Sequence, residues 1–194
     1  MKYSLLLLLS IFFLSFGVLN YEKINNGVLN WKERQLSWQD YKIVDMGLNE
    51  HSANTKTRIK VNCNTKGDYL ECSINSLFER SKSWVVKDSK SEYLLNHEQR
   101  HFDITEYYSR NLRQRLINHK FNSFNSLELE LKIMYNSCDY SKDSLQDLYD
   151  YETSHSLISN SQEYWNAKID SMLDSKKSFS NPTFNLDVKY LHKP

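Results

Sequence analysis

Two stretches in the first half of the chain alternate polar and apolar residues. They run from Arg58 to Cys63 and from Tyr69 to Asn75, and a short β-branched and aromatic run follows at Ser83–Val86. A period of two residues is typical of strands with one buried face, and clusters of Asn, Gly, Asp and Ser bound these runs. We therefore expect an antiparallel β-sheet between about residues 25 and 87.

The period changes to that of a helix at about Ser91. Residues that share one helical face recur at i, i+3 and i+4 spacing: Leu94, His97, His101, Ile104, Tyr108 and Leu112. A second set falls on the opposite, polar face: Gln99, Asp103, Glu106, Arg110 and Arg113. Glu106 and Arg110 have the spacing of an i,i+4 ion pair. The pattern predicts one helix from Ser91 to Asn118.

The rest of the chain also favours helices. Helical periods predict further helices at 126–135, 142–151 and 162–173, whereas 178–194 shows no clear period. Strands followed by helices are typical of the α+β class. We expect a single domain over residues 20–194, in which an N-terminal antiparallel β-sheet is followed by a helical half.

The first residues have the pattern of a secretory signal peptide. Lys2 precedes an almost unbroken apolar run from Leu5 to Leu19, and polar chain begins at Asn20. The run is shorter than the roughly 20 residues needed to span a bilayer, so cleavage is favoured over an uncleaved anchor. We expect residues 1–19 to be a signal peptide. The mature protein would be secreted or periplasmic, with no stable membrane insertion.

Charge and cysteine content narrow the functional classes. The 25 Lys and Arg residues nearly balance the 24 Asp and Glu residues, for a formal net charge of +1. A nucleic-acid-binding protein normally has a basic surplus, so we expect no nucleic-acid partner. Export permits disulfides, and Cys63 and Cys72 flank a turn-like segment. They either pair across a hairpin or remain thiols like Cys138, and both readings stay open.

The predicted helix from Ser91 carries the motif His97-Glu98-Gln99-Arg100-His101, an HExxH sequence. Residues at i and i+4 lie about 40° apart around a helix, so both imidazoles can reach one Zn²⁺ ion. Glu98 can take a proton from a zinc-bound water and pass it to a leaving amine. Two buried histidines without partners would be costly, so a shared metal explains them better than core packing. We expect a zincin-like active-site helix.

A catalytic zinc needs a third protein ligand and one open position. Glu106 lies about 140° around the helix from His101, and His119 lies about 27 Å along a continuous helix, so neither reaches the metal. The remaining candidates are Glu128, Glu130, Asp139 and His155. We favour His155, because a neutral imidazole is a good zinc ligand and Asp150 lies just upstream to accept its far N–H. A glutamate from the next helix would give a His₂Glu site instead.

Three stretches of the chain resemble a bacterial family of predicted secreted or periplasmic zinc-dependent proteases, domain-of-unknown-function family 922. The stretches are LSWQDY at 36–41, SWV at 83–85 with LLNHEQRHFDI at 94–104, and YDYETSH at 149–155 followed by Gln162 and Trp165. They are similar to the family's LSWxDF, SWV…LLxHEQxHFDI and YDxxTxHG…Q..W segments. The chain departs at Ser156, where the family favours Gly. The resemblance implies a zinc peptidase fold and draws attention to the segment that contains His155.

These observations predict an exported zinc metallopeptidase that hydrolyses peptide bonds in a peptide or protein substrate. Zinc would be held by His97, His101 and His155, with Glu98 as general base. The preceding sheet can present an edge strand to an extended peptide. Two alternatives stay open: a non-catalytic exported zinc-containing binding module, and a metal-dependent amidase acting on cell-envelope material. Glu98 argues against the binding module, because a purely structural zinc site has no use for it.

Overall fold

The computed structural model describes residues 27–46 and 51–192. Its main sheet contains β1 (Val28–Asn30), β4 (Thr57–Lys66), β5 (Tyr69–Glu79) and β7 (Thr183–Asp187). β4 pairs along one edge of β5, while β1 and β7 pair with opposite ends of the other edge, and every pair is antiparallel. The alternating stretches thus form the antiparallel β4–β5 hairpin of the sheet, as predicted.

A second, smaller sheet has the strand order β2–β6–β3, made of β2 (Lys42–Val44), β6 (Trp84–Val86) and β3 (Ala53–Asn54). β3 is antiparallel to β6, whereas β2 runs parallel to it. The sequence predicted one antiparallel sheet in this half, so the division into two sheets and the parallel pair are departures from it. β3 is an edge strand in the part of the chain that the structure describes.

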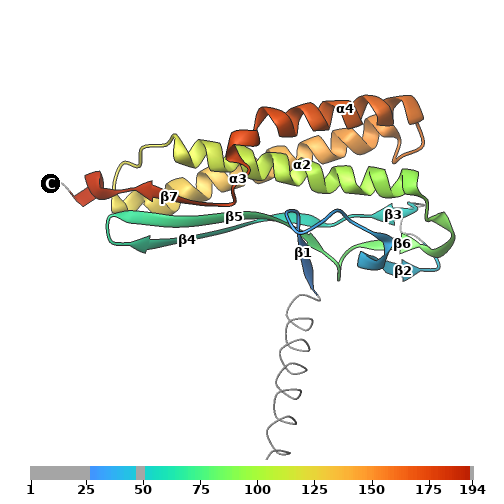
Figure 1. Cartoon of the computed structure of the whole chain (residues 1–194), viewed down its shortest axis with the longest axis horizontal. Helices are drawn as coiled ribbons and strands as arrows, with labels where there is room; N and C mark the ends of the chain where they lie inside the picture. Colours follow the sequence, from blue (N-terminus) through green and yellow to red (C-terminus); the bar gives the residue numbers. More distant parts are fainter. Residues whose placement is uncertain (1–26, 47–50, 193–194) are drawn as a thin grey trace, which may run out of the picture.

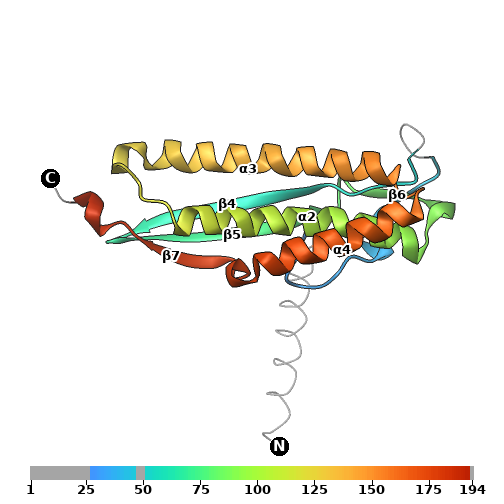
Figure 2. The same cartoon turned by 90° about the horizontal axis from the view of Figure 1, so that it is seen from above.

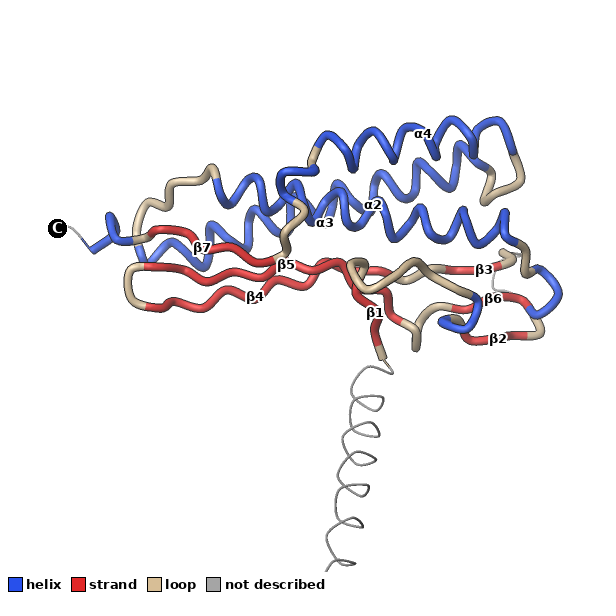
Figure 3. The backbone as a smooth tube through the Cα atoms, viewed as in Figure 1, coloured by secondary structure: helices blue, strands red, loops and turns tan. Residues whose placement is uncertain are grey.

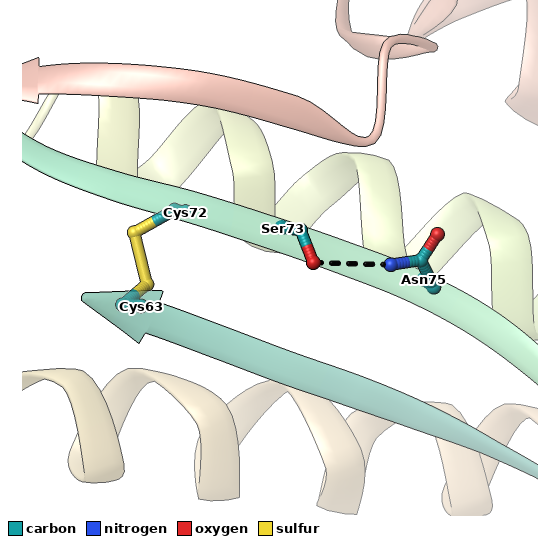
Figure 4. The surroundings of a disulfide bond; sticks show 4 residues. All are labelled: Cys63, Cys72, Ser73 and Asn75. Carbon is teal, nitrogen blue, oxygen red and sulfur yellow. Dashed lines mark hydrogen bonds between the residues drawn. A yellow bond between two sulfur atoms is a disulfide. The ribbon is translucent and has the colours of Figure 1, made fainter.

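The β4–β5 hairpin is closed by a turn and a disulfide. Gly67 in the turn has a φ of 58°, a left-handed conformation that glycine adopts at little cost because it lacks a Cβ. Cys63 lies opposite Cys72, and a disulfide joins them across the two strands (Figure 4). The sequence left open whether these cysteines pair or remain thiols, and in the structure they pair. Cys138 is a buried free thiol.

Three long helices lie along one face of the main sheet (Figures 1 and 3). They are α2 (Glu92–Ile117), α3 (Phe124–Thr153) and α4 (Ser159–Ser175). Seen from above, α2 lies between α3 and α4 (Figure 2). Short 3₁₀ helices occur at η1 (Trp38–Asp40), η3 (Lys87–Ser89), η4 (Lys177–Phe179) and η5 (Lys189–His192). The α+β class, with an N-terminal sheet and a helical second half, is confirmed.

Helix α2 has the predicted bounds, but the polar face that was expected to be exposed is largely buried. Ser91 caps its start, with its hydroxyl accepting the Leu94 N–H at 3.1 Å. The side of α2 expected to face solvent is buried, because sheet and helices enclose α2: Asp103, Glu106, Arg110 and Arg113 are all at most 6 % exposed. Glu106 accepts from Arg110 at 2.9 Å and from Arg113 at 3.0 Å, so these charges are paired inside the fold. The predicted Glu106–Arg110 pair is confirmed.

Helix α3 replaces two predicted helices with one. The sequence predicted a break between residues 135 and 142, where Asn, Ser and Asp weaken the helical pattern. The structure continues through this stretch because Cys138 and Lys142 are buried within it. Lys142 pairs with Asp139 at 2.7 Å and with Asp143 at 3.1 Å on its own helix. Tertiary packing and these pairs outweigh the weak local propensity.

The tail, in which the sequence showed no period, contributes β7. Its residues Thr183–Asp187 pair with Tyr69–Ser73 of β5. Leu186 is buried and Phe184 packs against the same hydrophobic cluster, which joins the hairpin to α2 and α3. An alternation over five residues is too short to be recognised as a strand in the sequence. Pairing with β5 stabilises the strand, although its local pattern is weak.

The predicted signal peptide, residues 1–19, lies outside the described residues. Among the helices that are described, none has the length and apolar character needed to cross a membrane.

Candidate functional site

The HExxH residues lie near the start of α2, at the end of the molecule that holds β3 and β6 (Figure 1). His97, Glu98 and His101 are 2, 3 and 6 % exposed. All of them line a cavity of about 350 Å³ between α2, the end of α3 and the segment 51–57 that contains β3. The first part of the predicted apolar face, with Leu94, His97 and His101, therefore lines a cavity, whereas Ile104 and Leu112 of the same face are buried in the hydrophobic core.

The end of α3 brings two further side chains to this cavity through a Schellman motif. The backbone N–H of His155 donates to the carbonyl of Asp150 at 2.9 Å, and the N–H of Ser154 donates to the carbonyl of Tyr151 at 3.2 Å. The 6→1 bond folds the chain back, so that Asp150 and His155 both line the cavity although five positions separate them. Local helix termination thus positions part of the site.

Three potential metal ligands converge here. One ligand atom from each of His97, His101 and Asp150 lies within 4.8 Å of the other two. Asp150 Oδ1 is 3.1 Å from His97 Nε2 and 3.0 Å from His101 Nε2. Both histidines are buried and Asp150 is half-buried. This group can hold a metal ion, as the sequence predicted for the two histidines.

The other nitrogen of each imidazole has a glutamine partner. His97 Nδ1 is 2.9 Å from Gln162 Oε1, and His101 Nδ1 is 3.0 Å from Gln146 Oε1. The amide nitrogens of both glutamines donate elsewhere, Gln162 to the Tyr149 hydroxyl and Gln146 to the Thr105 hydroxyl. Both amide oxygens therefore accept from Nδ1–H, so each Nε2 atom faces Asp150 and can carry either a proton or a metal ion. This tautomer is the one that binds a metal through Nε2.

Asp150 Oδ1 lies close to two imidazole nitrogens, and each of them can offer a lone pair. A cation is therefore needed between the carboxylate oxygen and these nitrogens. Burial alone would lower the pKa of His101, but the charge and hydrogen bond of Asp150 outweigh it and raise that pKa to about 9. Burial would raise the pKa of Asp150, and the neighbouring histidines instead hold that pKa well below its usual range. A proton or a metal ion can fill the position, and the two compete for the same atoms.

Tyr149 fixes the orientation of the two rings. Its ring stacks on His97, with centroids 4.6 Å apart, and meets His101 edge-on at 5.1 Å. Its hydroxyl donates to the His97 carbonyl at 3.3 Å and accepts from Gln162 at 2.6 Å. Burial raises the pKa of Tyr149, so the hydroxyl stays protonated. The histidines are therefore held by packing as well as by hydrogen bonds.

Glu98 is the unusual group of the site. It is buried, it lines the cavity, and its Oε2 atom has no hydrogen-bond partner within the described part of the chain. A buried carboxylate oxygen without a partner costs free energy that a merely structural residue has no reason to incur. The atom itself is closed to solvent, but the residue lines the cavity, so the carboxylate lies beside the space that a water or a substrate would occupy.

The rival third ligands lie elsewhere. Glu128 is exposed, Glu130 binds His119 at 2.6 Å, and Asp139 pairs with Lys142. Glu106, which helix geometry excluded, is bound by Arg110 and Arg113 inside the fold. Of the candidates that the sequence left open, His155 is the one that lines the cavity.

His155 is near the ligand group but not a member of it. Its Nδ1 atom is 3.5 Å from Asp150 Oδ1, and its side chain is 51 % exposed. Its ring packs against His51, from the opposite side of the cavity, with centroids 4.2 Å apart. Its role as a zinc ligand stays a prediction, while Asp150, expected behind His155, lies closer to the two histidines.

Sequence reasoning missed Gln146 as a partner of the site and gave Gln162 no role. A signal was present for the first: Gln146 and Asp150 have i,i+4 spacing and share a face of α3. The predicted helix 142–151 contained both residues, but only Asp150 was connected to the metal. Gln162 belongs to a different helix, and sequence spacing alone does not place it beside His97.

No protein-family model, curated protein or solved structure matches the chain.

Proposed function

We propose that this protein is a zinc-dependent metallopeptidase that cleaves peptide bonds in the cavity beside α2. The observation that carries the proposal is the carboxylate of Glu98, buried without a hydrogen-bond partner next to three converging metal ligands. A structural metal site is normally closed by a fourth Cys or His and has no need of such a group.

The residues present fit a zinc ion. Two imidazole nitrogens and a carboxylate oxygen form a nitrogen and oxygen donor set typical of catalytic zinc. Gln162 and Gln146 hold both imidazoles in the metal-binding tautomer. We propose Asp150 as the third ligand, because its carboxylate lies close to both histidines. The sequence favoured His155 for this position. When bound, zinc polarises a carbonyl and lowers the pKa of water.

Glu98 has the position and the freedom to move protons. Its carboxylate would accept a proton from the attacking water and would later donate it to the nitrogen of the leaving amine. Because Glu98 Oε2 makes no hydrogen bond within the described part of the chain, the carboxylate is not held in place by a bond from that atom. The buried site also strengthens the electrostatic interactions among the reacting groups.

The cavity suits an extended peptide. One wall is formed by Ser52–Thr57, which include the edge strand β3, and the other wall is formed by α2 and α3. An extended substrate can pair its main chain with an edge strand and so pass its scissile bond over the metal ligands. The resemblance to secreted zinc-dependent proteases points to the same activity, and the signal-like N-terminus supports action outside the cytoplasm. An amidase acting on cell-envelope material would use the same groups.

Glu98→Gln tests the proposal. The variant should retain zinc, because Glu98 is not a ligand, and should lose at least about 10² in turnover, the scale of a lost general base. Zinc content and cleavage of a mixed peptide library are measured on the same preparations. Gln114→Glu provides a control on the same helix, away from the cavity, where Gln114 binds Lys176.

Two results would count against the proposal. A Glu98→Gln variant as active as the wild type would remove Glu98 from the mechanism. A zinc-loaded wild type that cleaves neither peptides nor envelope amides would favour the binding module.

A further inference from the structure

His155 has two possible partners in the cavity, and this placement supports an inference that rests on the proposed metal site. On one side, its Nδ1 atom lies 3.5 Å from Asp150 Oδ1. On the other, its ring packs on His51, which comes from the segment that precedes β3. The residue therefore lies between the metal group and the opposite wall of the cavity.

The backbone of His155 is fixed while its side chain is comparatively free. The Schellman bond to the Asp150 carbonyl tethers it at 2.9 Å. Ser154, His155 and Ser156 all have left-handed φ values, of 50, 52 and 73°. Left-handed backbone is costly for residues with a Cβ, and such strain is often found at ligand clamps and switch regions. Since the side chain is 51 % exposed, it has space to turn.

The distances place the imidazole of His155 just outside the coordination shell of the proposed metal. Ligand atoms around a tetrahedral zinc with bonds of about 2.1 Å lie about 3.4 Å from one another. The 3.5 Å between His155 Nδ1 and Asp150 Oδ1 meets this requirement for one ligand. The histidine is nevertheless outside the group formed with His97 and His101. A rotation of its side chain away from His51 is the change that would bring it in.

We propose that His155 is a displaceable fourth ligand of the metal. It closes the open coordination position when the cavity holds no substrate, and it withdraws against His51 when a substrate enters. The site then has a closed form with four protein ligands and an open form with three. The proposal gives His155 a metal-binding role, as the sequence indicated, together with Asp150 rather than in its place.

Acetohydroxamate, which binds zinc through two oxygens, reports on the open position. In zinc-loaded His155→Ala the position is always open, so acetohydroxamate should bind about tenfold more tightly if the wild type is open in about a tenth of molecules. Zinc itself should be held more weakly, by about tenfold in competition with a chelator, because a ligand is lost. His51→Ala removes the contact of the withdrawn form and should weaken acetohydroxamate binding.

Tyr151→Ala is the matched control, since Tyr151 is 81 % exposed on the same last turn of α3. It should change neither affinity. Opposite effects of His155→Ala on zinc and on acetohydroxamate support the proposal, because general damage to the site would weaken both.

Three results would overturn it. Acetohydroxamate affinity unchanged or lowered in His155→Ala would show that this histidine does not occupy the open position. Loss of all zinc in His155→Ala, with zinc retained in Asp150→Ala, would make His155 a permanent third ligand. A wild-type protein that binds no zinc would reject the metal site itself. Lack of peptide cleavage, with the affinities as expected, would contradict only the proposed function.

Discussion

The candidate site also depends on residues outside the group of potential metal ligands, and Gln162 is one of them. It accepts from His97 Nδ1 and donates to both Tyr149 and Asn166. One amide thus sets the tautomer of a potential metal ligand and anchors the tyrosine that stacks on it. The side chain is 1 % exposed, so water cannot replace these bonds.

Gln162→Leu should therefore weaken zinc binding. Leucine has a similar size but cannot accept from His97, so we expect a loss of about 10–100-fold in zinc affinity, the usual cost of losing such a partner. Chelator competition measures this value. Gln114→Leu is the control, because Gln114 lies on α2 and its side chain binds Lys176, away from the cavity. Equal zinc affinities in the two variants would remove Gln162 from the metal site.

Single residues were predictable from the sequence where local spacing decides their position. His97, Glu98 and His101 follow from one turn of helix, and the structure places them together in the cavity. Asp150 and His155 depend on where α3 ends and how it ends. The sequence gave no distance between that turn and α2, so it could not predict which of the two side chains lies closer to the two histidines.

At the scale of elements, the end of α3 is strained. Ser154 has φ 50° and ψ 48°, the left-handed position that glycine occupies most often after a helix. A Cβ there is unfavourable, so the present sequence gives up stability at the turn that presents His155.

Ser154→Gly should consequently raise the free energy of unfolding by about 0.5–1 kcal/mol. Ser144→Gly is a matched control, since Ser144 lies exposed in the interior of α3, where the same change should cost about 0.5 kcal/mol. Urea denaturation of both variants tests the opposite signs. If Ser154→Gly is destabilising as well, the turn is not strained in solution.

Elements with a strong local period were predictable, and those maintained by distant contacts were not. α2 carries its own cap and apolar face, and its bounds follow from them. α3 crosses a weak stretch because Cys138 and Lys142 are buried, and β7 exists because β5 offers it an edge. Both features depend on residues far away in the sequence.

At the scale of the whole molecule, the disulfide and the candidate site lie toward opposite ends. The Cys63–Cys72 bond is near the turn of the β4–β5 hairpin, whereas the start of α2 is beside β3 and β6 (Figures 1 and 4). A short loop closed by a disulfide restricts the unfolded chain, which is worth about 2–3 kcal/mol.

Reduction should thus lower the free energy of unfolding by about 2–3 kcal/mol and leave zinc binding intact. Denaturation with and without a phosphine reductant gives the first quantity, and zinc stoichiometry gives the second. The double variant Cys63→Val, Cys72→Val should behave like the reduced protein, since Cys138 is not part of the bond. A reduced protein that loses its zinc would show that the two ends are coupled.

The two strands that share one edge of β5 come from opposite ends of the described chain. β1 pairs with Leu77–Glu79 and β7 with Tyr69–Ser73, so the sheet is complete only when residues 183–187 have been made. A product truncated before that point would expose unpaired N–H and C=O groups along β5, directly beside a buried apolar surface. Exposed strand edges of this kind pair with one another. Copies that lack residues 183–187 should therefore self-associate, because β7 is what covers this edge of β5.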